Sequence, residues 1–479
     1  MTPSLDTIFA LSSGRPPAAI AVVRISGPQA GRALQALAGK MPPPRHAALA
    51  TLRDPASREP IDQAVVLWFP GPNSETGEDI AELQLHGGRA VIAAALDALS
   101  RIDGLRPAEA GEFTRRAFEN GRIDLTAVEG LADLIGAETE AQRRQAFRQL
   151  RGLLGDRAEG WRRRLIEALA LVEAGLDFSD EADVPADVAA PALRLARELR
   201  DEIGAVLADA PRGERLREGL TIAIAGPPNA GKSSLFNWLA GRDAAIVSPY
   251  PGTTRDVLEV HLDLGGYPLT VLDTAGVRDS TDPVEAEGVR RAQARAAEAD
   301  LVLWVTDAAQ HRATAPPDST AGEGAPARWM IFNKIDLLDA DALRAMANLA
   351  DDAGERSAGG APDADRIERD RSRTEARQRF PVSVRDGTGL ETLLAALADF
   401  ARETFGGGEP ALITRARHRH NLNKTYEILD HIMNTNSYHQ LELIAEELRL
   451  AARALGRLTG RIDVEDVLNV IFREFCIGK

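Results

Sequence analysis

The chain has 479 residues, of which 44% are hydrophobic and 27% are charged, and its formal net charge is −15. This length suffices for about three domains, and the composition is typical of a soluble globular protein. A single cysteine excludes a disulfide within the chain and favours a reducing compartment. Because the overall charge is acidic, any contact with nucleic acid has to use local basic patches.

The first residues, MTPSLDTIFALSSG, lack a basic leader and a sustained apolar core, so no secretory signal is expected. No apolar run approaches the ~18 residues that a membrane span requires. Both features predict a cytoplasmic protein with no membrane contact.

The first two regions of the chain differ in the period of their apolar residues. Residues 1–121 contain short β-rich runs, AIAVVRISG, QAVVLWFP and EDIAELQLHGG, and one helical stretch, RAVIAAALDALSRI. This mixture predicts an N-terminal α/β domain. In residues 122–217 apolar residues recur at steps of three or four, which predicts helices. Members of that pattern are Leu125, Val128, Leu131 and Ile135, and then Trp161, Leu165, Leu169 and Val172.

The third region alternates strands with helices, and the fourth returns to a helical pattern. Residues 218–405 carry the short apolar runs LTIAIAG, LTVLDTAG, LVLWVTDA and WMIFNK, which are typical of a buried parallel sheet. After the sequence FGGGEP, residues 406–479 show helical periodicity again. The fold class predicted for the chain is multidomain α/β plus all-α, with a helical domain interrupted by an inserted Ras-like P-loop domain.

Two stretches of the third region are poor in apolar side chains. Residues 311–328 and about 351–378 are rich in Ala, Gly, Pro and charged residues. Such segments cannot bury enough apolar surface to fold, so both are predicted to be solvated insertions without chemistry.

The segment GPPNAGKSS fits the pattern G-x-x-x-x-G-K-[ST] between a predicted strand and a predicted helix. Its glycines let backbone N–H groups surround phosphate oxygens, and the helix N-terminus attracts their charge. Lys232 can reach the β- and γ-phosphates, and the Ser233 hydroxyl can bind Mg²⁺. The predicted phosphate loop consists of Asn229, Ala230, Gly231, Lys232, Ser233 and Ser234.

Two further motifs fit the γ-phosphate and the magnesium ion. PGTTRD stands where a GTPase keeps its switch I threonine, so Thr254 is predicted to bind Mg²⁺. DTAG follows the run LTVL and places Asp273 at a strand end, where its carboxylate can hold Mg²⁺ through water. The residues of this second motif are Asp273, Thr274, Ala275 and Gly276.

The motif NKID follows the apolar run WMIF and fits a guanine base. The Asp336 carboxylate suits the N1–H and 2-amino donors of guanine, whereas adenine would leave this carboxylate unpaired. Asn333 can meet the other edge of the base, and the stem of Lys334 can cover its face. Ser383 and Val384, in PVSVRDGTGL, are predicted to back the base. Four motifs in this order predict a GTPase.

The hydrolytic step needs a group that the motifs themselves do not supply. Val277 occupies the position where Ras-type enzymes carry a water-orienting glutamine. The side-chain oxygen of Asn229 can help to hold a monovalent cation, which would take the electrostatic role of an arginine finger beside Lys232. Glu285, in VRDSTDPVEAEG, is the candidate for orienting water, and a solvated switch-loop carboxylate is the equal alternative.

The sequence resembles the MnmE (TrmE) family of tRNA modification GTPases over nearly its full length. The resemblance is carried by AVVRISG at 21–27, WFPGPNSETGED at 68–79, the inserted G domain, SPYPGTTRD, DTAGVRD and the terminal FCIGK. It implies a homodimer with an N-terminal folate-binding domain. It also implies that the two G domains meet across the nucleotides when GTP and K⁺ are bound.

The family's motif positions imply a set of ion ligands. Mg²⁺ would be held by Ser233 and Thr254, and Glu285 would activate the attacking water. The implied K⁺ ligands are Asn229, Ser248, Tyr250 and Thr253. Further nucleotide contacts implied in the same segment are Pro249, Pro251 and Gly252.

The resemblance also implies a folate site and a modification partner. A tetrahydrofolate derivative, 5-formyl or 5,10-methylene, would be bound by Arg24, Glu82, Arg122 and Lys479. Arg122 stands where the family frequently has a lysine. Arginine keeps the positive charge but changes the geometry of that contact. With the flavoprotein MnmG, the family adds an aminomethyl or carboxymethylaminomethyl group to C5 of the wobble uridine (U34) of certain tRNAs. The folate supplies the methylene carbon.

Cys476, in the terminal FCIGK, has two interpretations. The motif implies a thiol that matters for modification, and Lys479 would favour its thiolate. The C-terminal dipole of the preceding predicted helix opposes a thiolate, however, so a packing role stands beside the reactive one.

Three basic segments of the helical regions can meet tRNA phosphates: QRRQAFRQLRG, WRRR and ITRARHRH. A solvated helix face explains each of them as well, and for any single cluster it is the preferred interpretation.

Two other functions compete with tRNA modification. One is a GTPase switch in ribosome assembly without one-carbon chemistry, and the other is a free-standing folate-dependent one-carbon transferase. Nucleotide motifs alone do not separate them, because a fold does not fix its output. The N-terminal segment and the FCIGK end favour the modification enzyme.

Overall fold

In the computed structural model the described residues form two compact units. The first unit comprises Met1–Gly136, Ala146–Leu207 and Ala416–Lys479, and the second comprises Ala137–Gln145 and Ala208–Arg415. Because the first unit groups the predicted N-terminal domain with both predicted helical halves, the domain boundaries given above stay a prediction. The described residues are 6–177, 190–242, 244–246, 259–273, 299–310, 326–344, 378–406, 411–434, 441–462, 471–472, 475 and 478.

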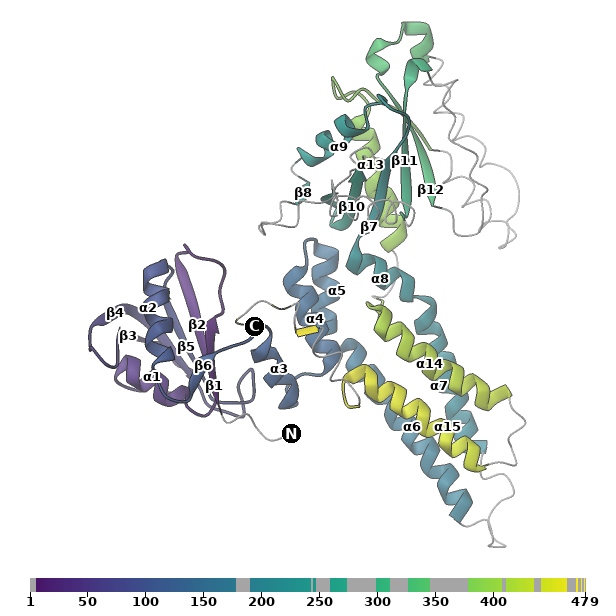
Figure 1. Cartoon of the computed structure of the whole chain (residues 1–479). Helices are drawn as coiled ribbons and strands as arrows, with labels where there is room; N and C mark the ends of the chain where they lie inside the picture. Colours follow the sequence, from purple (N-terminus) through teal and green to yellow (C-terminus); the bar gives the residue numbers. More distant parts are fainter. Residues whose placement is uncertain are drawn as a thin grey trace, which may run out of the picture. The chain divides into compact units, whose positions relative to one another are not determined.

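In the described part of the first unit, six strands form one sheet in the order β3-β4-β5-β2-β1-β6. Neighbouring strands are antiparallel, except that β1 and β6 are parallel. Helices α1 (Ala30–Ala38) and α2 (Arg89–Ser100) cover one face of this sheet (Figure 1). The strands are β1 (Thr7–Leu11), β2 (Ile20–Ser26), β3 (Ala48–Arg53), β4 (Pro60–Phe69), β5 (Ile80–His86) and β6 (Leu105–Pro107).

The two faces of β1 pack into different cores. Phe9 joins the large core beneath α1 and α2, whereas Ile8 and Ala10 pack with Phe113 of α3 (Glu112–Glu119). Successive side chains of a strand point to opposite faces, so α3 lies on the face away from α1 and α2. Arg24 pairs in register with Ala10 and therefore lies on the α3 side of the sheet.

Long helices make up the rest of the first unit. Along α6, Trp161, Leu165 and Val172 are buried at the spacing of one helix face. Helix α15 packs along both α6 and α14, although α6 and α15 are far apart in the sequence (Figure 1). Residues 208–415 of the second unit are thus inserted in the chain between these helices. These helices are α4 (Leu125–Gly136), α6 (Leu153–Asp177), α7 (Ala190–Ala208), α14 (Ala416–Asn434) and α15 (Leu441–Thr459). Helix α5 (Glu140–Leu150) begins in the second unit and ends in the first.

In the described part of the second unit, seven strands form a mostly parallel sheet in the order β13-β12-β11-β7-β10-β9-β8. Only the pairs β9·β10 and β8·β9 are antiparallel. After β7 the chain builds β9 and β10 on one side and β11 to β13 on the other. Ligands of such sheets bind at this switch point, outside the carboxyl ends of the strands. The strands are β7 (Leu220–Ala225), β8 (Ala245–Ile246), β9 (Glu259–Leu264), β10 (Tyr267–Asp273), β11 (Leu301–Asp307), β12 (Ala327–Asn333) and β13 (Arg379–Pro381).

The apolar runs of this sheet form its core. Ile222 and Ile224 of β7, Leu303 of β11 and Ile331 of β12 are fully buried, as expected for strands covered on both faces. The helices of the unit are α8 (Ala210–Glu218), α9 (Lys232–Ala240) and α13 (Leu390–Phe405), with short 3₁₀ turns η2 (Ala308–Gln310) and η3 (Ile335–Leu337). The fold is multidomain α/β plus helical, as the sequence predicted.

One predicted boundary is wrong. We expected a solvated insertion over residues 311–328, but β12 already begins at Ala327. Ala327 pairs with Leu301, and the guanidinium of Arg328 lies 5.7 Å from the ring centroid of Trp304, so strand pairing and an aromatic contact order this end. Residues 311–325, and 351–377 of the second predicted insertion, lie outside the described residues. Among the described helices, none combines the length and the hydrophobicity of a membrane span.

Candidate functional site

The predicted phosphate loop connects the end of β7 to the start of α9. Gly226 and Gly231 have left-handed φ angles of +140° and +94°. A Cβ at Gly226 would lie 2.0 Å from the carbonyl oxygen of Val305, and one at Gly231 would lie 2.1 Å from Nδ2 of Asn333. Asn229 also adopts a positive φ, 59°, without being glycine. The loop therefore has the curled backbone and the close packing that a phosphate cradle needs.

Lys232 is the first residue of α9, and its ammonium group lies over the loop. Nζ donates to the carbonyl oxygens of Gly226 and Pro227, both at 2.9 Å. Ser233 and Ser234 follow in the first helical turn and are exposed. The cation and the hydroxyls thus surround the N-terminus of one helix, where an anion is stabilised.

Asp273 ends β10 beside this loop. It pairs in register with Ile224 of β7 and is 2% exposed. Its carboxylate and the exposed hydroxyl of Ser233 come from neighbouring strand and helix ends. Carboxylate and hydroxyl oxygens are the ligands that Mg²⁺ prefers, so these residues fit a magnesium ion.

Asn333 joins the phosphate loop to the predicted base site. Its Nδ2 donates to the carbonyl oxygen of Ala230 at 2.9 Å, and its Oδ1 accepts from the backbone N–H of Lys334 at 2.8 Å and of Val384 at 3.2 Å. The side chain is 3% exposed, so these bonds lie away from solvent. The structure therefore gives Asn333 a connecting role, in addition to the base contact predicted for it.

Asp336 is oriented by its neighbours at the carboxyl ends of β12 and β13. The buried Ser383 hydroxyl donates to Oδ1 of Asp336 at 2.9 Å. The exposed Arg385 lies 3.9 Å from the other carboxylate oxygen. A carboxylate held in this way can accept two parallel donors, such as those of a guanine edge.

Sequence reasoning missed Asp307 in this part of the site. Asp307 ends β11, and its Oδ2 lies 2.9 Å from Nζ of Lys334. The signal that could have found it is an acidic residue at the end of LVLWVTD, the run that precedes WMIFNK in the chain.

Many predicted site residues lie outside the described residues, so no position is assigned to them. They are Ser248, Pro249, Tyr250, Pro251, Gly252, Thr253, Thr254, Thr274, Ala275, Gly276, Glu285, Cys476 and Lys479.

In the first unit the structure brings the predicted folate residues Arg24 and Glu82 together. They face each other across β2 and β5, and Arg24 Nε and Nη2 lie 3.0 and 2.9 Å from Glu82 Oε1. Arg24 Nη1 also pairs with Glu75 at 2.6 Å. The guanidinium lies 5.8 Å from the ring centroid of Phe113, so a cation, two carboxylates and an aromatic face adjoin here.

Arg122 and the chain's end lie against neighbouring parts of the same unit. The exposed Arg122 passes its stem beside Gly77, where a Cβ would lie 3.4 Å from Cγ and Cδ of the arginine. Gly478 has a φ of +99°, and a Cβ there would lie 2.1 Å from the carbonyl oxygen of Leu11. Leu11 is the residue after Ala10, the partner of Arg24 in the sheet. Gly478 therefore packs next to the strand pair that carries Arg24.

A buried ion network holds the loop between β4 and β5 next to this cluster. Arg116 is 3% exposed and pairs with Asp6, Glu78 and Glu112 at 3.0 to 3.2 Å. Ser26 donates to Glu78 at 2.8 Å, so the loop that carries Glu78 is tied to β2. Buried charges require such partners.

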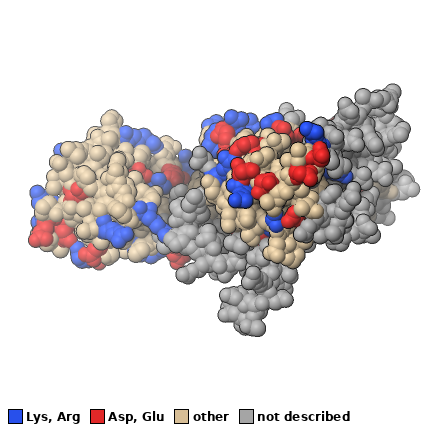
Figure 2. All heavy atoms as spheres, turned by 90° about the horizontal axis from the view of Figure 1, so that it is seen from above, with Lys and Arg blue, Asp and Glu red and all other residues tan. Residues whose placement is uncertain are grey.

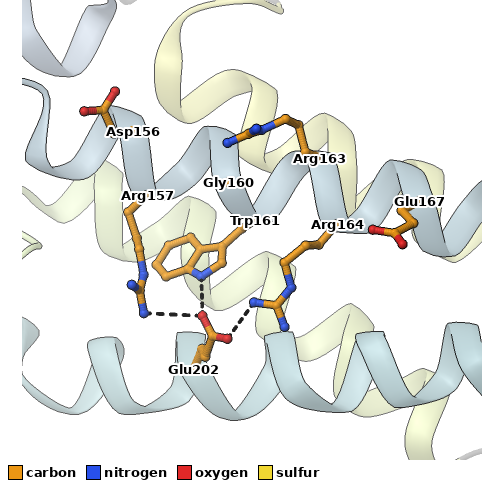
Figure 3. A pocket seen from close by; sticks show the side chains of 8 residues that line it. All are labelled: Asp156, Arg157, Gly160, Trp161, Arg163, Arg164, Glu167 and Glu202. Carbon is orange, nitrogen blue, oxygen red and sulfur yellow. Dashed lines mark hydrogen bonds and ion pairs between the residues drawn. The ribbon is translucent and has the colours of Figure 1, made fainter.

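In the segment WRRR, Arg162 and Arg164 pair with carboxylates of α6 and α7. Figure 3 shows Arg157 and Arg164 turned toward Glu202. Arg157 Nη2 lies 3.3 Å from Oε2 of this carboxylate, and Arg164 Nη1 lies 2.6 Å from Oε1. Trp161 Nε1 donates to Oε2 at 3.0 Å. The cleft there is lined by three arginines and three acidic residues. On the side of the molecule drawn in Figure 2, basic and acidic side chains lie among one another. Pairing supports a structural role for WRRR over a phosphate contact.

The third basic segment is partly buried. Glu129 is 1% exposed, accepts from Arg417 at 3.0 and 2.7 Å, and lies 2.6 Å from Nε2 of the fully buried His418. Arg417 also donates to the carbonyl oxygens of Arg457 and Leu458 at 3.1 Å. Arg417 and His418 therefore bind α4 to α14 and α15 and are removed from the candidate tRNA contacts.

Comparisons with known proteins agree with this architecture. The family "GTP-binding protein TrmE N-terminus" matches residues 7–122, and the family "MnmE helical domain" matches residues 125–476. A solved structure of the FeoB G-domain from Methanococcus jannaschii is 24% identical over 38% of this chain and 98% of that chain, with a TM-score of 0.24, which is too low to add to the assignment.

Full-length relatives are much more similar. The "tRNA modification GTPase MnmE" of Bradyrhizobium sp. (strain ORS 278) is 56% identical over 100% of both chains. The protein of the same name from Rhodopseudomonas palustris (strain BisB18) is 55% identical over 99% of both chains. With its phosphate loop, guanine motif and inserted α/β unit, the chain belongs to the MnmE family of tRNA modification GTPases.

Proposed function

We propose that this GTPase is the K⁺-stimulated, GTP-hydrolysing subunit of a complex that modifies C5 of the wobble uridine of tRNA, using a tetrahydrofolate-derived one-carbon unit. The full-length identity to MnmE proteins supports tRNA as the substrate. The observation that carries the proposal is that Asn333 joins the phosphate loop to the base site, while in the other unit Gly478 packs against Leu11 on the strand beside the paired Arg24 and Glu82.

At the nucleotide site, the residues of this chain bind GTP and orient the attacking water. The loop N–H groups and Lys232 hold the phosphates, and Asp336 selects guanine through its two oxygens. Ser233 and Thr254 would hold Mg²⁺, which neutralises the phosphate charge when bound, with Asp273 in reach through water. Glu285 would orient the attacking water in place of the glutamine that Val277 replaces.

For K⁺ we propose Asn229, Ser248, Tyr250 and Thr253 as ligands. Asn229 supports this assignment because it is exposed and adopts a left-handed φ of 59° within the phosphate loop. A bound K⁺ adds positive charge where negative charge develops in hydrolysis. We expect turnover to be fast in K⁺ and slow in Na⁺. If Asn229→Ala leaves the K⁺ stimulation unchanged, this ligand set is wrong.

The role of Glu285 has its own test. Glu285→Ala should retain GTP binding, measured by equilibrium titration, and lose hydrolysis, measured as phosphate release. Unchanged turnover would make Glu285 an ordinary surface carboxylate.

For the folate we propose Arg24, Glu82, Arg122 and Lys479 as the binding residues. Arg24 offers a cation beside the aromatic face of Phe113, which suits a ligand with both carboxylates and a flat ring. Gly478 lies against Leu11 of β1, and the proposal assigns Lys479, the next residue in the sequence, to the same site. Cys476 would contribute either a thiol for modification or packing of the tail.

A homodimer is proposed through the first unit. The face of its sheet opposite α1 and α2 leaves Leu49 65% exposed, and Ile20, at the start of β2, is 61% exposed. A second copy of the chain would bury such side chains. The proposed partner in the reaction is a flavoprotein of the MnmG kind, and the proposed location is the cytoplasm, where tRNA and GTP are at hand.

Two measurements on the purified protein test the proposal. Phosphate release is followed in K⁺ and in Na⁺, and binding of 5-formyl-tetrahydrofolate is followed by calorimetry. K⁺-dependent hydrolysis together with folate binding is expected. K⁺-dependent hydrolysis without folate binding would favour the ribosome-assembly switch instead.

A further inference from the structure

Lys334 folds back across the sheet edge rather than extending into solvent. It follows the last residue of β12 with a left-handed φ of 68°, and Asn333 pairs in register with Asp307 of β11. Lys334 Nζ lies 2.9 Å from Asp307 Oδ2, and the two side chains are 33% and 17% exposed. The lysine stem therefore spans the carboxyl ends of two neighbouring strands.

Both ends of this lysine are fixed. Its backbone N–H donates to Oδ1 of Asn333 at 2.8 Å, and its ammonium is held by Asp307. Asp307 is fixed in turn, because its Oδ1 accepts the N–H of Ala309 at 3.0 Å in the turn that follows β11. The carboxylate thus uses one oxygen for the turn and the other for the lysine.

A lysine held at both ends loses its rotamer freedom during folding rather than during ligand binding. Ordering a long side chain opposes binding, so ordering it in advance increases affinity. We propose that Asp307 is a positioning residue for guanine-nucleotide binding, which holds the Lys334 stem as a preformed surface for the face of the base. This inference rests on the base-covering role proposed for Lys334.

The variant D307N separates the two uses of the carboxylate. Asparagine keeps an acceptor for the Ala309 N–H but removes the charge that holds Lys334. We expect D307N to bind a fluorescent GDP analogue roughly fivefold more weakly, as for the loss of a partly exposed ion pair. The loss should be equal for GTP and ITP, because the stem covers the face of a base and does not read its edge, and kcat should not change.

The matched control is D399N. Asp399 pairs with Arg402 on α13 at 2.6 Å, and both side chains are more than half exposed, so this variant removes one negative charge without touching the base site. It should bind nucleotide as the parent chain does. D307E, which keeps the charge one methylene further away, should recover part of the affinity that D307N loses.

The decisive comparison is made in a K334M background, which keeps the stem and removes the ammonium. D307N should have no further effect there, because its effect acts through Lys334. The inference is overturned if D307N weakens nucleotide binding as much in the K334M background as in the parent chain. It is also overturned if D307N alone binds nucleotide as tightly as the parent chain does. If K334M itself binds nucleotide as tightly as the parent chain, the proposed role of Lys334 fails and the inference fails with it.

Discussion

The nucleotide site of the second unit and the candidate folate site of the first unit are built from different kinds of contact. The phosphate loop is shaped by glycines whose missing Cβ atoms admit Val305 and Asn333. Around Arg24 the geometry comes from ion pairs among side chains that lie far apart in the sequence. Backbone shape is set by a short local motif, whereas ion pairs need the tertiary fold. The two sites should therefore fail under different substitutions.

The largest effect is expected at Glu129, where the first unit depends on buried charge. Glu129→Gln leaves Arg417 and the fully buried His418 without their counter-charge. Such a change should lower the free energy of unfolding by about 3–5 kcal/mol. Denaturant unfolding measures it, and Glu173→Gln, whose partner Arg449 is less buried, is the control. Nucleotide affinity should stay unchanged, and a parallel loss of GTP binding would contradict the contrast between the units.

Gly231 tests the other side of the comparison. Gly231→Ala puts a Cβ 2.1 Å from Asn333 Nδ2 at a φ of +94°, so the loop has to distort. We expect GTP affinity to fall about a hundredfold, as for a few kcal/mol of backbone strain. Gly241→Ala, at the end of α9 with a φ of −85°, is the control. Folate binding should be retained; its loss in the same variant would mean that the two sites are not independent.

Acid should weaken the first unit through the same buried cluster. Burial acts to raise the pKa of Glu129, but the charges and hydrogen bonds of His418 and Arg417 outweigh it and hold the pKa well below its usual range. Because folding lowers the pKa of Glu129, its ionised carboxylate stabilises the folded chain fully at pH values above the pKa of the unfolded chain. This stabilisation is lost progressively as the pH falls below that value toward the folded pKa.

The difference in unfolding free energy between the parent chain and Glu129→Gln should therefore shrink by about 0.7 kcal/mol between pH 7 and pH 4, because the unfolded carboxyl has a pKa of about 4.3 and the folded one is still ionised at pH 4. Urea titrations at both pH values measure it. A difference that is the same at pH 4 would show that folding does not lower the pKa of Glu129.

The smallest effect is expected at Arg24. Arg24→Lys keeps the charge but loses the planar fork that lies between Glu82 and Glu75. We expect folate affinity to fall about tenfold, the scale of one charge-assisted hydrogen bond. Calorimetric titration measures it, with Arg53→Lys on the exposed edge strand β3 as the control. GTP turnover without tRNA should not respond to either change.

The sequence was a better guide to the second unit than to the first. Lys232, Asn333 and Asp336 could be placed because strand, glycine and helix signals surround them within a few residues. The sequence did not predict the hydrogen bonds by which Asn333 connects the two motifs, or the ion pair between Asp307 and Lys334. Both depend on which strands become neighbours in the sheet.

In the first unit periodicity alone predicted helices and strands, and the family resemblance supplied the residues of the candidate folate site. Neither indicated that Arg417 and the buried His418 pair with Glu129, since a basic segment looks solvated until its acidic partner 288 residues away is known. The start of β12 at Ala327 was missed for a similar reason, because pairing with β11 overrides a composition that is poor in apolar residues.

The central claim is that one chain couples a guanine-nucleotide site to one-carbon chemistry on tRNA. Mass spectrometry of the wobble uridine in cells that lack the chain tests it most directly. We expect the C5 modification to disappear, to return with the parent chain, and not to return with either Gly231→Ala or Arg24→Ala. Modification that persists without the chain, or that both variants restore in full, would contradict it.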